Sequence, residues 1–156
     1  MTRRLLAASL FVLCASTASA APELAACPFS PGELAASFGK AFRNGKGTQT
    51  AIPGGTQATC TYAQDRSSLV LTVVQTVLPE AEHRRRKAEF NKGLAGTLTA
   101  MAADPDGATW QLDPYAPNFM ALHYLRGTKR VELRVTGTYF RPAEMQPKLL
   151  RLRRLR

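Results

Sequence analysis

Histidine, cysteine and acidic residues are scarce in this 156-residue sequence, and each shortage excludes a class of protein. Three cysteines are too few for a disulfide-dense miniprotein, and two histidines leave little from which to build a metal cluster. Eleven Asp and Glu against 21 Lys and Arg give a formal net charge of +10. Because 45% of the residues are hydrophobic, the composition is that of a globular domain rather than of a disordered chain.

The sequence also lacks an internal apolar run long enough for a membrane-spanning helix. Its one extended apolar stretch lies at the N-terminus and has the three regions of a secretory signal peptide. These are the cations Arg3 and Arg4, the apolar run Leu5–Leu13 and the small residues Ala18-Ser19-Ala20. We therefore expect residues 1–20 to be cleaved before Ala21 and the protein to be exported, either to the periplasm or as a secreted protein.

Loss of the signal peptide would remove Cys14 and leave Cys27 and Cys60 as the two cysteines of the mature chain. An even pair in an exported protein is typical of a structural disulfide. The sequence therefore predicts one disulfide between Cys27 and Cys60.

Motifs for metal binding and catalysis are missing. His83 and His123 lie 40 residues apart, and neither has a second His or a Cys at ligand spacing. There is no Gly-x-Ser-x-Gly or Ser-x-x-Lys motif. Asp104 and Asp106 lie in a Pro-Gly turn, where Asp is expected to bond its own backbone. We therefore predict no catalytic, cofactor-binding or metal-binding residues, and a protein that is not an enzyme.

The expected elements follow the order helix, three strands, helix, three strands, helix. The capping box Ser30-Pro31-Gly32-Glu33 opens the first helix, which runs to about Phe42, and Pro53-Gly54-Gly55 joins two strands as a hairpin. Strands are expected at Thr48–Ile52, Gln57–Ala63, Ser67–Val77, Ala108–Leu112, Asn118–Leu125 and Lys129–Gly137; helices at Pro79–Ala103 and from between Pro142 and Pro147. Because hairpins dominate, we expect a single α+β domain over residues 21–156. It would have a mostly antiparallel sheet of about six strands, with helices packed on one face.

Two of these strands indicate how the sheet is covered. The strand at 67–77 is apolar at both odd and even positions, so both of its faces should be at least partly covered. The strand at 129–137 instead alternates apolar residues with Arg130, Glu132 and Arg134. This second side either faces solvent or binds a partner.

An aromatic stretch lies between the last strands. Trp110, Tyr115 and Phe119 fall close together, and prolines at 114 and 117 shape the loop between them. Aromatic side chains on a rigid loop suit recognition of a protein, whereas packing in the core is the alternative interpretation. The candidate partner-binding residues are Trp110, Tyr115, Phe119, Arg130 and Arg134.

The C-terminal segment 148–156 carries five cations in nine residues and no acid. As a helix it would place Leu149 and Leu152 on one stripe, so it is a basic amphipathic segment. It could pack its leucine side on the domain, lie on an anionic surface, or form an edge strand. The candidate residues for an anionic surface are Lys148, Arg151, Arg153, Arg154 and Arg156.

Two functional hypotheses follow. The first is an exported, non-catalytic domain that binds a protein partner in an accessory, inhibitor or immunity-type role. The alternative is a protein that binds the cell envelope, using its basic C-terminal segment on anionic lipid or lipopolysaccharide. That segment contains no aromatic residue on which bases could stack, which argues against nucleic acid as a partner.

Overall fold

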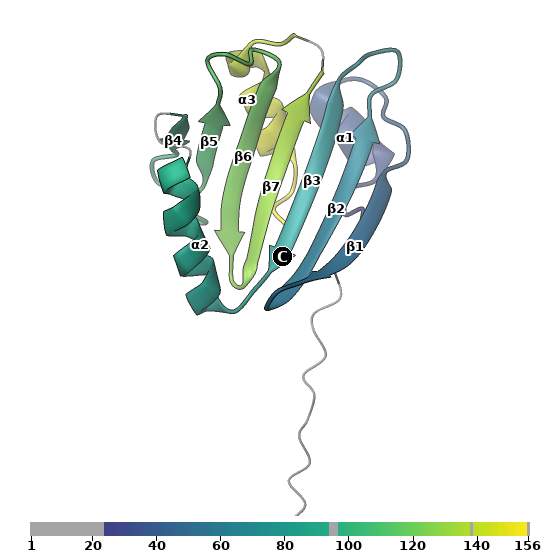
Figure 1. Ribbon diagram of the computed structural model, residues 1–156. Coiled ribbons are helices and arrows are strands. Elements are labelled where there is room, and N and C mark those ends of the chain that lie inside the picture. Colours follow the sequence, from purple (N-terminus) through teal and green to yellow (C-terminus); the bar gives the residue numbers. More distant parts are fainter. Residues whose placement is uncertain (1–23, 94–96, 138, 156) are drawn as a thin grey trace, which may run out of the picture.

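Within the residues that the structure describes, seven strands form one antiparallel sheet flanked by three helices (Figure 1). The computed structural model describes residues 24–93, 97–137 and 139–155; the predicted signal peptide lies outside them. The elements are α1 (Pro31–Phe38), β1 (Lys46–Ile52), β2 (Gly55–Ala63), β3 (Val70–Val77), α2 (Glu80–Gly93), β4 (Leu98–Ala100), β5 (Thr109–Leu112), β6 (Phe119–Arg126), β7 (Lys129–Thr136) and α3 (Pro142–Arg151). The strand order is β1-β2-β3-β7-β6-β5-β4.

This architecture confirms the predicted α+β class, and it differs from the expected element list in the middle of the chain. The predicted helix Pro79–Ala103 ends at Gly93, and Leu98–Ala100 forms the short strand β4, which pairs with β5. The sheet therefore has seven strands rather than about six. Gly93 and Gly96 weaken a helix here by about 1 kcal/mol each. Backbone pairing with β5 supplies the alternative hydrogen bonds. Leu94, an apolar residue of the predicted helix between Gly93 and β4, lies outside the described residues.

Local signals explain where α1 begins and ends. The Ser30 hydroxyl accepts a hydrogen bond from the Glu33 amide at 3.2 Å, and the Glu33 carboxylate accepts one from the Ser30 amide at 2.8 Å. This is the predicted capping box, with Pro31 at the first helical turn. The helix ends at Gly39, whose φ of 73° is left-handed, so it stops earlier than the expected Phe42.

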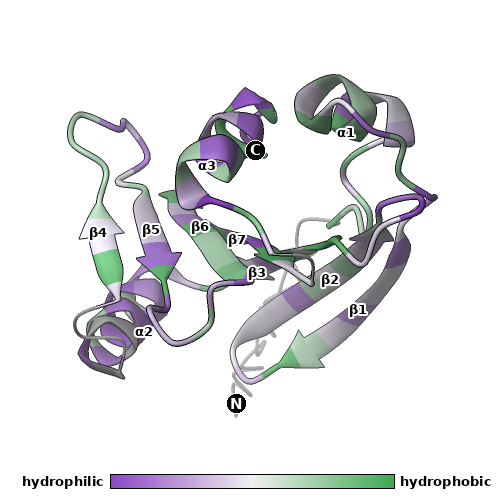
Figure 2. Cartoon of the chain, turned by 90° about the horizontal axis from the view of Figure 1, so that it is seen from above, coloured by the Kyte–Doolittle hydropathy of each residue, from purple (hydrophilic) through white to green (hydrophobic). Residues whose placement is uncertain are grey.

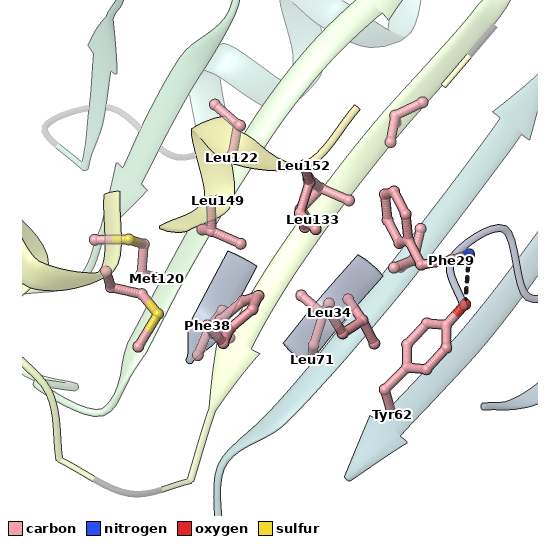
Figure 3. Close-up of a cluster of buried hydrophobic side chains, with 14 of the residues drawn as sticks. Phe29, Leu34, Phe38, Tyr62, Leu71, Met120, Leu122, Leu133, Leu149 and Leu152 are labelled. Carbon is pink, nitrogen blue, oxygen red and sulfur yellow. Dashed lines mark hydrogen bonds between the residues drawn. The ribbon is translucent and has the colours of Figure 1, made fainter. Parts of the chain in front are cut away.

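Helices α1 and α3 pack on one face of the sheet, which we call the core face (Figure 2). The two helices touch each other through Ser37, whose hydroxyl donates to the Lys148 carbonyl at 2.7 Å. Their apolar side chains meet those of the central strands, as Figure 3 shows. The labelled residues are Phe29, Leu34, Phe38, Tyr62, Leu71, Met120, Leu122, Leu133, Leu149 and Leu152. This layer is the hydrophobic core.

Helix α2 lies against the opposite face, so the expectation that all helices pack on one face is wrong for this element (Figures 1 and 2). The physical reason is its composition: eight of its 14 residues are charged, and it has no wide apolar stripe to bury. Ion pairs one turn apart join the charges instead, such as Arg84 with Glu80 and Arg85 with Glu89. The basic run Arg84–Lys87 is therefore largely a solvated helix surface.

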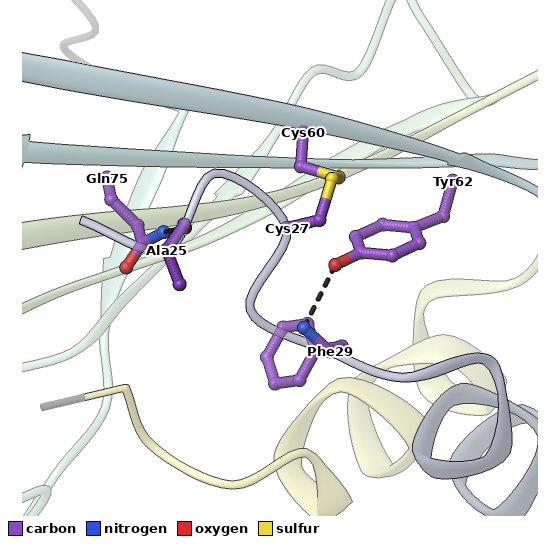
Figure 4. Close-up of a disulfide and its surroundings, with 6 residues drawn as sticks. All are labelled: Ala25, Cys27, Phe29, Cys60, Tyr62 and Gln75. Carbon is purple, nitrogen blue, oxygen red and sulfur yellow. Dashed lines mark hydrogen bonds between the residues drawn. A yellow bond between two sulfur atoms is a disulfide. The ribbon is translucent and has the colours of Figure 1, made fainter. Parts of the chain in front are cut away.

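The predicted disulfide is present and joins the segment before α1 to β2 (Figure 4). Two hydrogen bonds hold the same segment against the sheet. The Phe29 amide donates to the Tyr62 hydroxyl at 2.9 Å, and the Gln75 side-chain amide donates to the Ala25 carbonyl at 2.7 Å. Cys60, Tyr62 and Gln75 are all buried on the core face. The disulfide thus closes the core beside β1 and β2.

Candidate functional site

The structure separates the five candidate partner-binding residues. Trp110 is 6% exposed and packs in the core, whereas Tyr115 is 94% exposed in the loop between β5 and β6. Phe119, Arg130 and Arg134 are all on the side of the sheet that faces away from α1 and α3, with Arg134 beside Phe119 and Arg130 at the other end of the strands. The sequence grouped Trp110 with Phe119 by proximity, but they occupy different strands and point to opposite faces.

The basic C-terminal segment is packed on the domain. Leu149, Leu152 and Leu155 are each at most 5% exposed and belong to the hydrophobic core. The Leu155 amide donates to the Tyr124 hydroxyl at 3.0 Å, and burial raises the pKa of that Tyr124 hydroxyl. Of the interpretations left open by the sequence, the structure shows the one in which the leucine side packs on the domain.

Ion pairs engage part of the charge in this segment. Arg153 pairs with Glu33 at 2.7 Å, and this contact is one cause of the lowered pKa of Glu33, after the Ser30 amide. Arg154 pairs with Asp104 at 2.6 Å and lies 4.4 Å from the centre of the Tyr124 ring. Arg151 is exposed, Lys148 is half-buried, and Arg156 lies outside the described residues.

The second side of the sheet, here called the open face, is built from cross-strand rows. The register places Gln57, Thr76, Arg130 and Leu125 in one row and Thr59, Val74, Glu132 and His123 in the next. A third row contains Thr61, Thr72, Arg134 and Ala121, and a fourth contains Val70, Thr136 and Phe119. The open face thus changes along the strands, from polar at the Arg130 end to partly apolar at the Phe119 end.

A chain of polar contacts crosses the middle of the open face. The Arg134 guanidinium donates to the Glu132 carboxylate at 2.7 Å, and the other Glu132 oxygen lies 3.8 Å from His123 Nδ1. His123 Nε2 lies 2.9 Å from the side-chain oxygen of Gln111, within hydrogen-bond distance. Burial lowers the pKa of His123 to about 4, although Glu132 acts in the opposite direction. At neutral pH the imidazole is therefore uncharged.

Helix α2 covers the Arg130 end of the open face. It is held there by contacts with two turns, the one between β6 and β7 and the one between β1 and β2. The His83 imidazole lies against the Thr128 carbonyl in the β6–β7 turn. Arg86 donates to the Pro53 carbonyl in the β1–β2 turn at 3.2 Å and pairs with Glu82 at 2.7 Å. Hydrogen bonds from Arg85 and Arg86 lower the pKa of the Glu82 carboxylate to about 2.

A cleft of about 260 Å³ lies between α2 and the sheet, and we call it the α2 cleft. Its lining residues are Gln57, Val74, Thr76, Leu78, His83, Arg86, Arg130 and Glu132. A smaller cavity of about 40 Å³, lined by residues including Lys87 and His123, lies on the other side of Arg130. Arg130 lines both spaces and is itself half-buried.

Sequence reasoning missed most of the residues that accompany Arg130 in the cleft. The alternation in β7 identified Arg130, Glu132 and Arg134 as one side of a strand. It could not show that Gln57 and Thr76 continue the same row, because strand register is not encoded in any one strand. A signal existed for His123, since it lies between the buried Leu122 and Tyr124 and so must point to the other face.

Comparison of this chain with family models, with curated proteins and with solved structures finds no match. None of the helices in the described part of the chain combines the length and the apolarity needed to cross a bilayer. Among the described residues, no three His, Cys, Asp or Glu side chains gather closely enough to hold a metal ion.

Proposed function

We propose that this protein is an exported, non-catalytic domain that binds a protein partner through the Phe119 end of its open face. The observation that carries the proposal is the group Val70, Thr72, Phe119, Arg134 and Thr136, here called the Phe119 patch. These side chains are neighbours across three strands and are all partly exposed, with no described helix over them. The disulfide between Cys27 and Cys60 agrees with an oxidising, extracytoplasmic location.

The chemistry of the Phe119 patch suits a protein partner. The Arg134 guanidinium lies 6.0 Å from the centre of the Phe119 ring, so the two side chains form one surface. Aromatic residues and Arg are enriched at protein interfaces, where they contribute much of the binding free energy. Two threonines and a valine surround them. A sheet surface of this kind favours a partner with a matching apolar centre.

Charge indicates the sign of the partner's surface. Arg130 and Arg134 lie in the rows on either side of the acid Glu132, and without the predicted signal peptide the chain has 19 Lys and Arg against 11 Asp and Glu, a formal net charge of +8. An acidic partner protein is therefore favoured, and its association should weaken as salt rises. The packed C-terminal segment supports the Phe119 patch over the alternative of envelope binding, because Leu152 and Leu155 are in the core and Arg153 and Arg154 are in ion pairs.

Site-directed photo-crosslinking tests the proposal. A photo-reactive amino acid replaces Thr72 on the open face in one variant and Arg151 on α3 in the other, each expressed in the producing cells. We expect one stoichiometric protein adduct from position 72 and none from position 151. Adducts from both positions, or from position 151 alone, would contradict the proposed surface.

The purified partner then allows a quantitative test. Arg134→Gln should weaken binding at least about tenfold, or ~1.4 kcal/mol, because it removes the cation and its contact with Phe119. The matched control is Arg84→Gln, which removes an exposed cation of α2 that is paired with Glu80, at the other end of the open face. Equal affinities for the two variants would refute the role of the Phe119 patch.

A further inference from the structure

The α2 cleft has features of a ligand site that the proposed protein-binding surface does not use. It lies at the opposite end of the open face from the Phe119 patch. Its floor is formed by two adjacent cross-strand rows, and its wall is formed by α2. The space of about 260 Å³ is just below the range of about 300–1,000 Å³ typical of sites for drug-sized ligands. The cleft is therefore of a size for a small molecule.

Hydrogen-bond donors dominate the lining. Gln57, Thr76 and Arg130 follow one another across β2, β3 and β7 in a single row, so their side chains project side by side into the cleft. Arg86 lines the cleft from α2. The cleft is thus bordered by two guanidinium groups, a carboxamide and a hydroxyl. A guanidinium group presents five N–H donors in a fixed plane and matches the oxygens of a carboxylate or a phosphate.

The acid in the lining is already neutralised. Glu132 lies in the neighbouring row, and its carboxylate accepts from Arg134 at 2.7 and 2.5 Å. Arg134 approaches from the Phe119 side and is absent from the cleft lining. Arg86 is in turn paired with Glu82 at 2.7 Å. The cations in and beside the cleft, Arg86, Arg130 and Arg134, outnumber the two acids Glu82 and Glu132, so the charge there is positive.

Concavity and burial strengthen the effect of this charge. A cleft with low-dielectric walls concentrates the field of its charges and raises the local concentration of counter-ions. Arg130 is half-buried at the floor, where its attraction for an anion is screened less than at an exposed position. The smaller cavity on its other side is lined by Lys87, a further cation.

We propose that the α2 cleft binds a small organic anion, whose carboxylate or phosphate group is held between Arg130 and Arg86 and is hydrogen-bonded by Gln57 and Thr76. This inference goes beyond protein binding and does not depend on it. The Phe119 patch and the cleft share no residue, so each can fail while the other stands.

Titration followed by amide NMR tests the proposal on the chain without its predicted signal peptide. The probes are inorganic phosphate and citrate, added at constant ionic strength against sodium chloride. We expect saturable shifts at the amides of the cleft rows, including the side-chain amide of Gln57. Binding of phosphate alone or of citrate alone would assign the oxyanion class. Linear shifts spread over the basic surface with either probe would overturn the proposal.

Variants then locate the binding group. Arg130→Gln should weaken the binding of the effective probe at least tenfold, and Arg130→Lys should weaken it less because the charge is kept. The matched control is Arg84→Gln, which removes an exposed cation of α2 that is paired with Glu80. It should change the affinity for the probe less than twofold. Equal affinity of Arg130→Gln and Arg84→Gln would overturn the proposal. If Arg130→Gln does not fold, Thr76→Val decides in the same way, since it removes one donor with little change of shape.

Discussion

The buried histidine on the open face makes the stability of the protein depend on pH in a defined window. His123 is 5% exposed and contacts Gln111, with Glu132 at 3.8 Å. Burial lowers its pKa from the ordinary value of 6.5 to about 4. We therefore expect the neutral imidazole to be part of the folded state, and replacement by glutamine to remove one titrating group from it.

The sign and the size of the effect follow from proton linkage. Between pH 6.5 and about 4 the unfolded chain protonates this imidazole and the folded chain does not, so proton binding stabilises the unfolded state relative to the folded state as the pH falls. The contribution of His123 is fully present above pH 6.5 and is lost as the pH falls to about 4. At about 1.4 kcal/mol for each pH unit, the total loss is about 3 kcal/mol.

Urea denaturation of the wild type and of His123→Gln, at half-unit steps from pH 7 to pH 4 and constant ionic strength, measures this contribution. The difference between the two free energies of unfolding cancels groups that titrate alike in both proteins, such as Glu33. The wild type should lose about 3 kcal/mol relative to the variant over this range. A flat difference would refute the reasoning. So would a difference that favours the wild type at low pH, because attraction by Glu132 would then outweigh burial.

Two further predictions concern the ends of the described chain. The double substitution Cys27→Ser/Cys60→Ser should lower the free energy of unfolding by about 3–4 kcal/mol, because the disulfide closes a loop with a sequence separation of 33; an unchanged chemical denaturation midpoint would contradict this. Deletion of Leu152–Arg156 should cost about 3–6 kcal/mol, since Leu152 and Leu155 are buried. Chemical denaturation measures this loss, and Arg151→Ala, at an exposed position, should change the free energy of unfolding by less than about 0.5 kcal/mol in the same assay.

Features of the fold that depend on neighbouring residues could be read from the sequence. The capping box at Ser30 places the start of α1, and Pro53-Gly54-Gly55 places the turn between β1 and β2. Alternation in β7 separates the core residues from Arg130, Glu132 and Arg134. Each of these signals acts over a few residues, and the structure retains each one because tertiary packing agrees with it.

Features that depend on distant residues could not be read in this way. The strand β4 has only three residues, and its hydrogen bonds to β5 are invisible in its own sequence. The same limit applies to the candidate site. Trp110 and Phe119 are close in the chain, yet their side chains lie on opposite faces of the sheet. Trp110 pairs with the buried Leu122 on the core face, whereas Phe119 pairs with Thr136 on the open face. The α2 cleft is lined by residues of β2, β3, β7 and α2, so no single segment of the sequence could predict it.

The uneven covering of the open face connects the fold with the proposed functions. The apolar character of both sides of β3 predicts cover on both sides, and α2 supplies it over the end that contains Thr76. At the other end Val70 and Thr72 stay partly exposed beside Phe119. Removal of apolar side chains such as Val70 and Phe119 from water is favourable, so a partner protein that covers this end would extend the cover that α2 gives to the other end. The two ends then differ in what suits them: a small anion beneath a helix at Arg130, and a protein surface at Phe119.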